Sequence, residues 1–573
     1  MMAPWEKAVL FLLITVLGGQ AVIVNAVPYD YSATTECLGE PLKPQYGGGI
    51  IVNPAFDESL DGWGSFDTAH VIHKVSKSGN MFSAARERSA PHHSISQKVM
   101  LEKDTHYILS AWLQVDEGTT DVKAIVMTPS GFVAAGAVEA KASCWSMLKG
   151  GFTSHISGPA ELYFESTNST SEIWVDNVSL QPFNHEEWRC HHDDTVRQER
   201  KMMVHIKAVD AKGKPVPGAN VSVTPIRQGF PFGNAINGAI LKSPEYQKWF
   251  ADRFTHTTFE NEMKWYGTEF TEGHEDYSVA DNMLIFAKKN NVQVRGHNVF
   301  WNDPDSQMSW VNKLNNEQLQ QAMTKRIKSV VSRYKGQVIH WDVNNENVHF
   351  NFFEKRLGPD ASTKIYQAVH QIDPNVILFL NDFNTLEEPG DTNATPDKFL
   401  KKFNEIKAGL PASAKMGIGL ESHFKKPNLP YMRTVLDKMA SAGVPIWLTE
   451  VDVGGTDAAS AQDLEQILRE GYAHPAVKGI VMWASWTPKG CYRMCLTDNN
   501  FKNHPVGDTV DKLIKEWKTH ALGTTSKVGT FQTQLTHGDY EVKVNHLSGN
   551  LSTVHRITID SMSHPELKVQ IRH

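Results

Sequence analysis

Hydrophobic and polar residues alternate in short runs over residues 47–183. Clear examples are residues 107–115 and 172–180, and Gly, Asp and Ser residues separate such runs from one another. Alternation places one face of a strand in a core and the other in solvent, so each run predicts a half-buried β-strand. Short alternating strands divided by turns are typical of a β-sandwich, which we predict for residues 47–183.

Between residues 229 and 520, apolar runs alternate with amphipathic segments. Segments 278–290, 316–334 and 431–442 repeat their apolar positions at helical spacing and predict α-helices. Short apolar runs between such helices predict buried parallel strands, and eight of them in about 290 residues predict a (β/α)8 TIM barrel. The predicted strands lie near residues 232–236, 256–259, 293–299, 338–343, 376–380, 417–420, 445–449 and 479–483.

The remaining segments flank these two domains. Residues 1–26 combine a weakly basic start, a short apolar run and Ala26, which predicts a secretory signal peptide that is cleaved off. A signal anchor is the alternative, but the run is short for a membrane span. Residues 27–46 lack periodicity and are expected to form a tether. We expect residues 184–228 to be a charged linker with a short β segment, and residues 521–573 a small β extension.

Length and charge narrow the possible classes of protein. A chain of 573 residues exceeds what one hydrophobic core usually serves, which agrees with several domains. The formal net charge of −7, without a basic stripe, argues against a nucleic acid partner. After residue 26 the hydropathy pattern predicts no membrane span, so we expect a secreted, extracellular protein with no membrane attachment.

The five cysteines suit an oxidising compartment. Cys491 and Cys495 could close a small loop; a zinc site is the rival interpretation, but no histidine pair accompanies them at ligand spacing. Cys144 with Cys190 is a possible second pair, which leaves Cys37 unpaired. Candidate N-glycosylation sites, which agree with secretion, are Asn168, Asn177, Asn220, Asn393 and Asn550.

Two carboxylates stand directly after two of the predicted barrel strands. Glu346 follows the strand at 338–343, and Glu450 follows the strand at 445–449. Because the carboxyl ends of barrel strands share one face, both side chains are expected at the same mouth. Such a pair suits cleavage of a glycosidic bond, in which one acid protonates the leaving oxygen and the other attacks the sugar carbon. Further polar or aromatic clusters end other strands, at 260–265, 295–301, 381–384, 421–423 and 483–486.

The barrel domain resembles glycoside hydrolase family 10, the retaining endo-β-1,4-xylanases, over nearly all of residues 229–520. The segments that carry the resemblance are Glu260-Asn261-Glu262-Met263-Lys264-Trp265, Arg295-Gly296-His297, Trp341-Asp342-Val343 with Asn345-Glu346, and Thr449-Glu450. The modular layout and residues 490–495 are most similar to secreted plant members.

The resemblance implies an endo-1,4-β-xylanase that acts on cell-wall xylan, such as arabinoxylan or glucuronoxylan, by double displacement. That chemistry requires no metal or organic cofactor. A xylan endotransglycosylase that uses the same residues is an alternative, because a sugar hydroxyl can replace water. A catalytically weak xylan-binding wall protein is a second alternative, which retention of both Glu346 and Glu450 argues against.

The resemblance also implies roles for individual residues. Glu346 would be the general acid/base and Glu450 the nucleophile, with Asn345 bonded to the sugar 2-hydroxyl and His423 bonded to the nucleophile. Asp342 and Asp452 would orient their neighbours. The other implied substrate-binding residues are Asn261, Lys264, His297, Trp301, Glu421, Trp483 and Tyr492.

Three positions depart from the family pattern. Glu421 stands where many members have Gln, and we hypothesise that it is protonated or paired, for example with His423, and shifts the pH optimum. Tyr492 stands near the place of a second Trp that closes over the sugar. Asn344 replaces an aliphatic residue and needs a hydrogen-bond partner.

The N-terminal domain resembles carbohydrate-binding module family 22. Residues 51–57, Gly62-Trp63 and residues 173–178 carry this resemblance, which implies a sandwich able to bind xylan. Residues 86–93 lack the aromatic platform expected for xylan. The remaining candidates for binding by this module are Arg86, Trp112 and Tyr163, and strand alternation leaves open whether the two rings are exposed.

Overall fold

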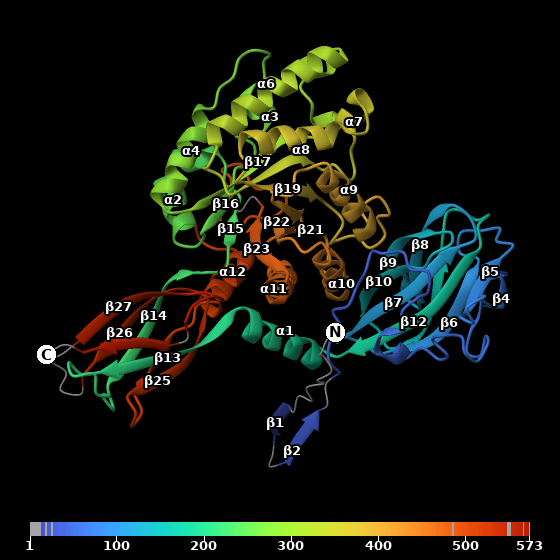
Figure 1. Cartoon of the computed structure of the whole chain (residues 1–573), viewed down its shortest axis with the longest axis horizontal. Helices are drawn as coiled ribbons and strands as arrows, with labels where there is room; N and C mark the ends of the chain where they lie inside the picture. Colours follow the sequence, from blue (N-terminus) through green and yellow to red (C-terminus); the bar gives the residue numbers. More distant parts are fainter. Residues whose placement is uncertain are drawn as a thin grey trace.

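The computed structural model describes residues 13–17, 20–24, 27–483, 486–546, 552–564 and 566–571. These residues form a barrel with helices around it, a β-sandwich on one side and a second β domain on the other (Figure 1). Helix α1 (His185–Glu199) runs between the two β domains, next to the barrel (Figure 1).

The predicted signal peptide lies largely outside the described residues. Its described parts are strands β1 (Leu13–Leu17) and β2 (Gln20–Val24), which pair antiparallel. None of the helices in the described parts of the chain has the length and hydropathy needed to cross a lipid bilayer.

The eight predicted strands of the large domain are present and close into a parallel barrel. β15 pairs with both β16 and β23, and β20 pairs with β22, which completes the ring. A short extra strand, β21 (His423–Phe424), pairs with the end of β22. The barrel strands are β15 (Phe232–Asn234), β16 (His256–Thr258), β17 (Gln293–Trp301), β18 (His340–Asn345), β19 (Ile377–Asp382), β20 (Met416–Leu420), β22 (Ile446–Val453) and β23 (Val477–Met482).

Helices pack around the barrel, and the three helices predicted from periodicity are α4, α6 and α10. A capping box formed by Asn315 and Gln318 starts α6 and satisfies backbone N–H groups that the helix itself leaves free. The helices are α2 (Pro244–Ala251), α3 (Trp265–Thr268), α4 (Ser278–Lys289), α5 (Ser309–Lys313), α6 (Asn316–Tyr334), α7 (Phe352–Leu357), α8 (Ala361–Ile372), α9 (Pro396–Ala408), α10 (Leu429–Ala440), α11 (Ala458–Ala473) and α12 (Pro505–Glu516), with 3-10 turns η1 (Gln45–Gly48), η2 (Gly238–Leu241) and η3 (Pro304–Ser306).

The N-terminal domain is the predicted β-sandwich of two antiparallel sheets. One sheet has the order β10-β7-β12-β5-β4 and the other the order β3-β6-β11-β8-β9. Apolar side chains of both sheets, such as Leu109, Val126 and Leu162, form the core between them. The strands are β3 (Gly64–Phe66), β4 (His70–Val75), β5 (Met81–Arg86), β6 (Ser94–Leu101), β7 (Thr105–Val115), β8 (Thr119–Thr128), β9 (Gly131–Lys141), β10 (Ser146–Ser154), β11 (Gly158–Glu165) and β12 (Ile173–Phe183).

The aromatic residues predicted to bind sugar in the sandwich are buried. Trp112 is 2% exposed and packs with Phe82 and other residues, and Tyr163 is 3% exposed and stacks on Phe66. Because neither ring offers a free face, neither can act as a sugar platform, and that prediction is wrong. Arg86 donates to Glu172 at 2.7 Å and stays partly exposed.

The segments expected as a linker and a C-terminal extension together form a third domain. Their strands build the sheets β25-β13-β28 and β24-β14-β26-β27, with a core that includes Val204, Ile206 and Val542. Residues 185–199 form helix α1, which begins with a capping box at Asn184. Each strand buries only one face, so the two distant segments complete one another. The strands are β13 (Lys201–Val209), β14 (Asn220–Gln228), β24 (Ala521–Thr524), β25 (Thr530–Thr536), β26 (Gly538–Asn545), β27 (Ser552–Ile559) and β28 (Glu566–Gln570).

The predicted tether is packed against the other domains. A disulfide joins Cys37 to Cys144, whereas Cys190 in α1 is a free thiol, so the suggested Cys144–Cys190 pair is wrong. The reason is local pairing, because Leu38 forms a β-bridge with Trp145 and brings Cys37 beside Cys144. The second predicted disulfide, Cys491–Cys495, is confirmed.

Candidate active site

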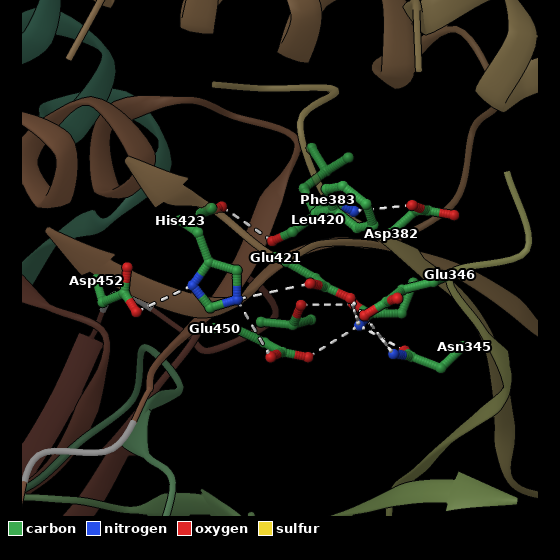
Figure 2. A network of polar contacts seen from close by, with 12 residues as sticks. Asn345, Glu346, Asp382, Phe383, Leu420, Glu421, His423, Glu450 and Asp452 are labelled. Atoms are coloured by element: carbon green, nitrogen blue, oxygen red, sulfur yellow. Dashed lines mark hydrogen bonds and ion pairs between the residues drawn. The ribbon is translucent and has the colours of Figure 1, made fainter. Parts of the chain in front are cut away.

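Glu346 and Glu450 meet at the barrel mouth, as the strand pattern predicts. Glu346 directly follows β18, and Glu450 lies in β22; both side chains are buried (Figure 2). Glu346 adopts a left-handed backbone with φ 57°, and its N–H donates to Asn381 O at 2.9 Å. A non-glycine residue in this conformation is strained, and such strain concentrates where a side chain must be aimed.

His423 links three acids of the site. Its Nε2 lies 3.5 Å from both Glu450 Oε2 and Glu421 Oε2, and its Nδ1 lies 3.0 Å from Asp452 Oδ2 (Figure 2). Burial lowers the pKa of His423, but these hydrogen bonds outweigh it and raise the pKa well above its ordinary value. Arg493 in turn fixes Asp452, because its Nε donates to Asp452 Oδ1 at 2.6 Å.

The two catalytic candidates differ in their electrostatic surroundings. Burial, followed by the negative charges of Asp382 and Glu450, raises the pKa of Glu346. Trp301 and Lys264 lower this pKa, but by less than burial and the two charges raise it. Burial also acts on Glu450, but His423 and His297 outweigh it and hold the pKa of Glu450 below its ordinary value. Glu346 is therefore suited to give a proton, and Glu450 to stay ionised.

Asn381 contacts two of the site carboxylates, a role that the sequence pattern does not predict. Its Nδ2 lies 3.1 Å from Glu450 Oε1, 3.2 Å from Glu421 Oε1 and 2.9 Å from Asn345 Oδ1. The Thr449 hydroxyl donates to its Oδ1 at 2.5 Å, which fixes the amide orientation. The available signal was the polar cluster at the end of β19. Arg493, which also had no predicted role, carried no such signal.

Several implied substrate-binding residues line the same mouth. Lys264 Nζ lies 4.4 Å from the Trp301 ring centre and 3.4 Å from Asn261 Oδ1. The ring of His297 lies 5.4 Å from that of Trp483. Lys264 and His297 are buried, whereas Trp301 and Trp483 are partly exposed, so these two rings offer the apolar faces that a sugar can contact.

The predicted role of Asp342 in orienting its neighbours agrees with its contacts. It accepts from Arg295 Nη2 at 2.6 Å and lies 2.8 Å from His297 Nδ1, and all three side chains are buried. His297 Nε2 then faces Glu450 Oε1 at 4.0 Å. Asp342, itself paired with Arg295, thus fixes the imidazole ring of His297 beside the carboxylate of Glu450.

Comparison with known proteins identifies the family. The sequence model of glycosyl hydrolase family 10 matches residues 224–512, which contain the barrel strands and both glutamates. The chain belongs to glycosyl hydrolase family 10. It is 39% identical over 527 residues to endo-1,4-beta-xylanase 5 of Arabidopsis thaliana, covering 90% of this chain and 89% of that protein. It is 36% identical over 585 residues to endo-1,4-beta-xylanase 4 of the same plant, covering 98% and 97%.

Two departures from the family 10 pattern have structural consequences. Asn344 donates to Ser362 Oγ at 2.8 Å, so its amide finds the expected partner, although its Oδ1 has none among the described residues. Tyr492 is 89% exposed on the loop closed by Cys491–Cys495. The structure therefore does not pack Tyr492 against the glutamates. Residues 484–485 of the predicted cluster after β23 lie outside the described residues.

The third departure places a third carboxylate, Glu421, in the family 10 site. It is buried between His423 and the amide of Asn345 (Figure 2), and it also accepts from the amide of Asn381. Burial, then the charges of Glu450 and Glu346, raise the pKa of Glu421 well above its ordinary value. Its protonation is therefore linked to that of both catalytic candidates.

We expect Glu421→Gln to shift the alkaline limb of the kcat/KM profile to lower pH. Ionised Glu346 and ionised Glu421 repel one another, and this repulsion raises the pKa of Glu421. A neutral amide in place of Glu421 removes the repulsion, so Glu346 should ionise at lower pH. Glu346 must carry a proton to act as an acid, so activity is lost as pH rises through that pKa. A shift of about half a pH unit corresponds to roughly 0.7 kcal/mol of repulsion. A profile on a polymeric glycoside that overlays the parent profile would contradict this prediction.

Proposed function

We propose that this family 10 protein is a retaining endo-1,4-β-xylanase that cleaves internal bonds of cell-wall xylan. The observation that carries the proposal is the pair Glu346 and Glu450, buried at one barrel mouth with pKa values shifted in opposite directions. Relatives that align over nearly the whole chain are named endo-1,4-beta-xylanases, which supports xylan as the substrate.

The proposed reaction proceeds in two displacements. Ionised Glu450 attacks the anomeric carbon while protonated Glu346 donates its proton to the leaving sugar oxygen. Glu346, now ionised, takes a proton from water, and that water releases the sugar from Glu450. Asn345, which accepts a hydrogen bond from Asn381, would bond the sugar 2-hydroxyl near the reacting carbon. Retaining glycosidases hold their two catalytic carboxyl groups about 5–5.5 Å apart, which is the separation that this mechanism requires.

We further propose that the protein is secreted into the cell wall with an N-terminal module of carbohydrate-binding family 22. Two disulfides support an oxidising compartment, and the sandwich fold supports the module. Among the candidate glycosylation sites, Asn220 and Asn393 are exposed and Asn168 is partly exposed, whereas Asn177 is buried. Asn550 lies outside the described residues.

Product analysis tests the proposed function directly. Purified protein and its Glu450→Ala variant are incubated with xylan and a labelled xylo-oligosaccharide. Mass spectrometry follows two product pools, the short oligosaccharides and the long xylan chains. We expect the parent, and not the variant, to release short unlabelled xylo-oligosaccharides. Transfer of the label into long chains would instead identify an endotransglycosylase. No Glu450-dependent change in either pool would indicate a wall-binding protein.

A further inference from the structure

Three metal-ligating side chains converge in the sandwich, outside the barrel. Asp67 directly follows β3, and His92 and His93 stand just before β6. Asp67 Oδ2 lies 3.1 Å from His92 Nε2 and 3.7 Å from His93 Nε2. One ligand atom from each residue falls within 4.8 Å of the others. Both imidazoles are thus directed at the same carboxylate oxygen.

The spacing of these atoms fits a tetrahedral zinc ion. Ligand atoms about 2.0–2.1 Å from zinc lie roughly 3.3 Å apart when the geometry is tetrahedral. The separations of 3.1 and 3.7 Å lie on either side of that value. Two imidazole nitrogens and one carboxylate oxygen favour zinc or a similar transition metal over calcium and magnesium, which prefer oxygen ligands alone.

The surrounding loop holds the histidines in place. Ser89 Oγ lies 3.3 Å from His93 Nδ1, and the backbone N–H of Ser89 donates to the same nitrogen at 3.5 Å, so both contacts hold the ring with its Nε2 toward Asp67. The buried side chain of Arg88 donates to the carbonyl oxygens of His93, Asn168 and Ser171 at 2.7–2.9 Å. This anchoring supplies the ordered outer shell that metal sites need.

We propose that Asp67, His92 and His93 form a zinc site with one coordination position open to solvent. Asp67 and His92 also line a groove of about 710 Å³ with Trp63 and Phe66, so the fourth position faces a space that a water or a ligand hydroxyl can enter. The sequence pattern predicts no metal site, because the ligands come from two loops that only the sheet pairing of β3 with β6 brings together.

Zinc titration of the full chain tests this site. Protein purified without a polyhistidine tag is stripped with a chelator, dialysed and titrated with ZnCl₂ by calorimetry. The parent should bind one equivalent that a His92→Ala/His93→Ala variant binds at least 100-fold more weakly, because loss of two ligands exceeds the 10–100-fold cost of losing an outer-shell partner. The variant should keep the parent's kcat on xylan, since its residues lie outside the barrel.

A second variant controls for non-specific binding by histidine. His155 and His274 are exposed and lie outside the cluster, so His155→Ala/His274→Ala should bind zinc as the parent does. Any zinc held by the acids around His423 would persist in both variants and would inhibit cleavage, which separates it from the sandwich site. Equal zinc binding by the parent and the His92→Ala/His93→Ala variant, or no binding by the parent, would overturn the proposal.

Discussion

Glu450→Gln should lower kcat on xylan by about 10⁴-fold or more, because the substitution removes the nucleophile of the first displacement. The amide has nearly the shape of the carboxylate and can still contact Asn381 and His423. It cannot, however, form the glycosyl ester, and the neighbouring carboxyl groups of Glu346 and Glu421 have raised pKa values, unlike Glu450. Substrate binding should therefore survive while chemistry is lost, which calorimetry with a xylo-oligosaccharide would show.

Glu421→Gln is the matched control for this change. It makes the same substitution on a carboxylate that bonds the same Asn381 and His423, but that is not assigned a covalent step. At its own pH optimum it should keep kcat within about tenfold of the parent. If Glu421→Gln lost as much activity as Glu450→Gln, the assignment of Glu450 as the nucleophile would be wrong.

Lys149→Met should destabilise the chain by about 3–5 kcal/mol, because it leaves a buried carboxylate without its cation. Lys149 in β10 of the sandwich donates to Asp437 in α10 of the barrel at 2.7 Å, and both side chains are 0% exposed. Tyr29 donates to the same Asp437 oxygen at 2.7 Å, and His474 Nε2 lies 3.2 Å from the other. This network holds the sandwich, the N-terminal segment and the barrel together.

The contribution of this network to stability depends on the protonation of Asp437. Burial raises the pKa of Asp437, but Lys149 and His474 outweigh it and hold the pKa below its ordinary value of 3.8. A carboxyl group whose pKa is lower in the folded state than in the unfolded state stabilises the fold at any pH above its unfolded-state pKa. That stabilisation is lost as the pH falls through the folded-state pKa. The loss in Lys149→Met should therefore be present in full at neutral pH.

Calorimetric unfolding at neutral pH measures the stability lost in Lys149→Met. Lys248→Met is the control, because Lys248 in α2 and its partner Asp252 just after α2 are exposed, and such i,i+4 pairs contribute about 0.3–0.5 kcal/mol. Lys149→Met/Asp437→Leu should recover most of the lost stability, since it removes both buried charges. A single Lys149→Met variant as stable as Lys248→Met would show that the network does not stabilise the interface.

The sequence alone determined the barrel and its two glutamates. Each barrel strand is a local apolar run, and Glu346 and Glu450 are placed by their distance from such a run. Local pattern is sufficient here because a parallel barrel brings all carboxyl ends of its strands to one mouth. The disulfide between Cys491 and Cys495 was equally local.

Contacts between distant segments were decided only by the tertiary structure. Asn381 gains its role because β19 places it between Glu421 and Glu450, and Cys37 finds Cys144 through a β-bridge more than a hundred residues along the chain. The third domain needs strands from both ends of the barrel sequence, and the burial of Trp112 depends on which face of its sheet is covered. Alternation predicts that a strand has a buried face, but the partner that covers this face is set by packing across the whole chain.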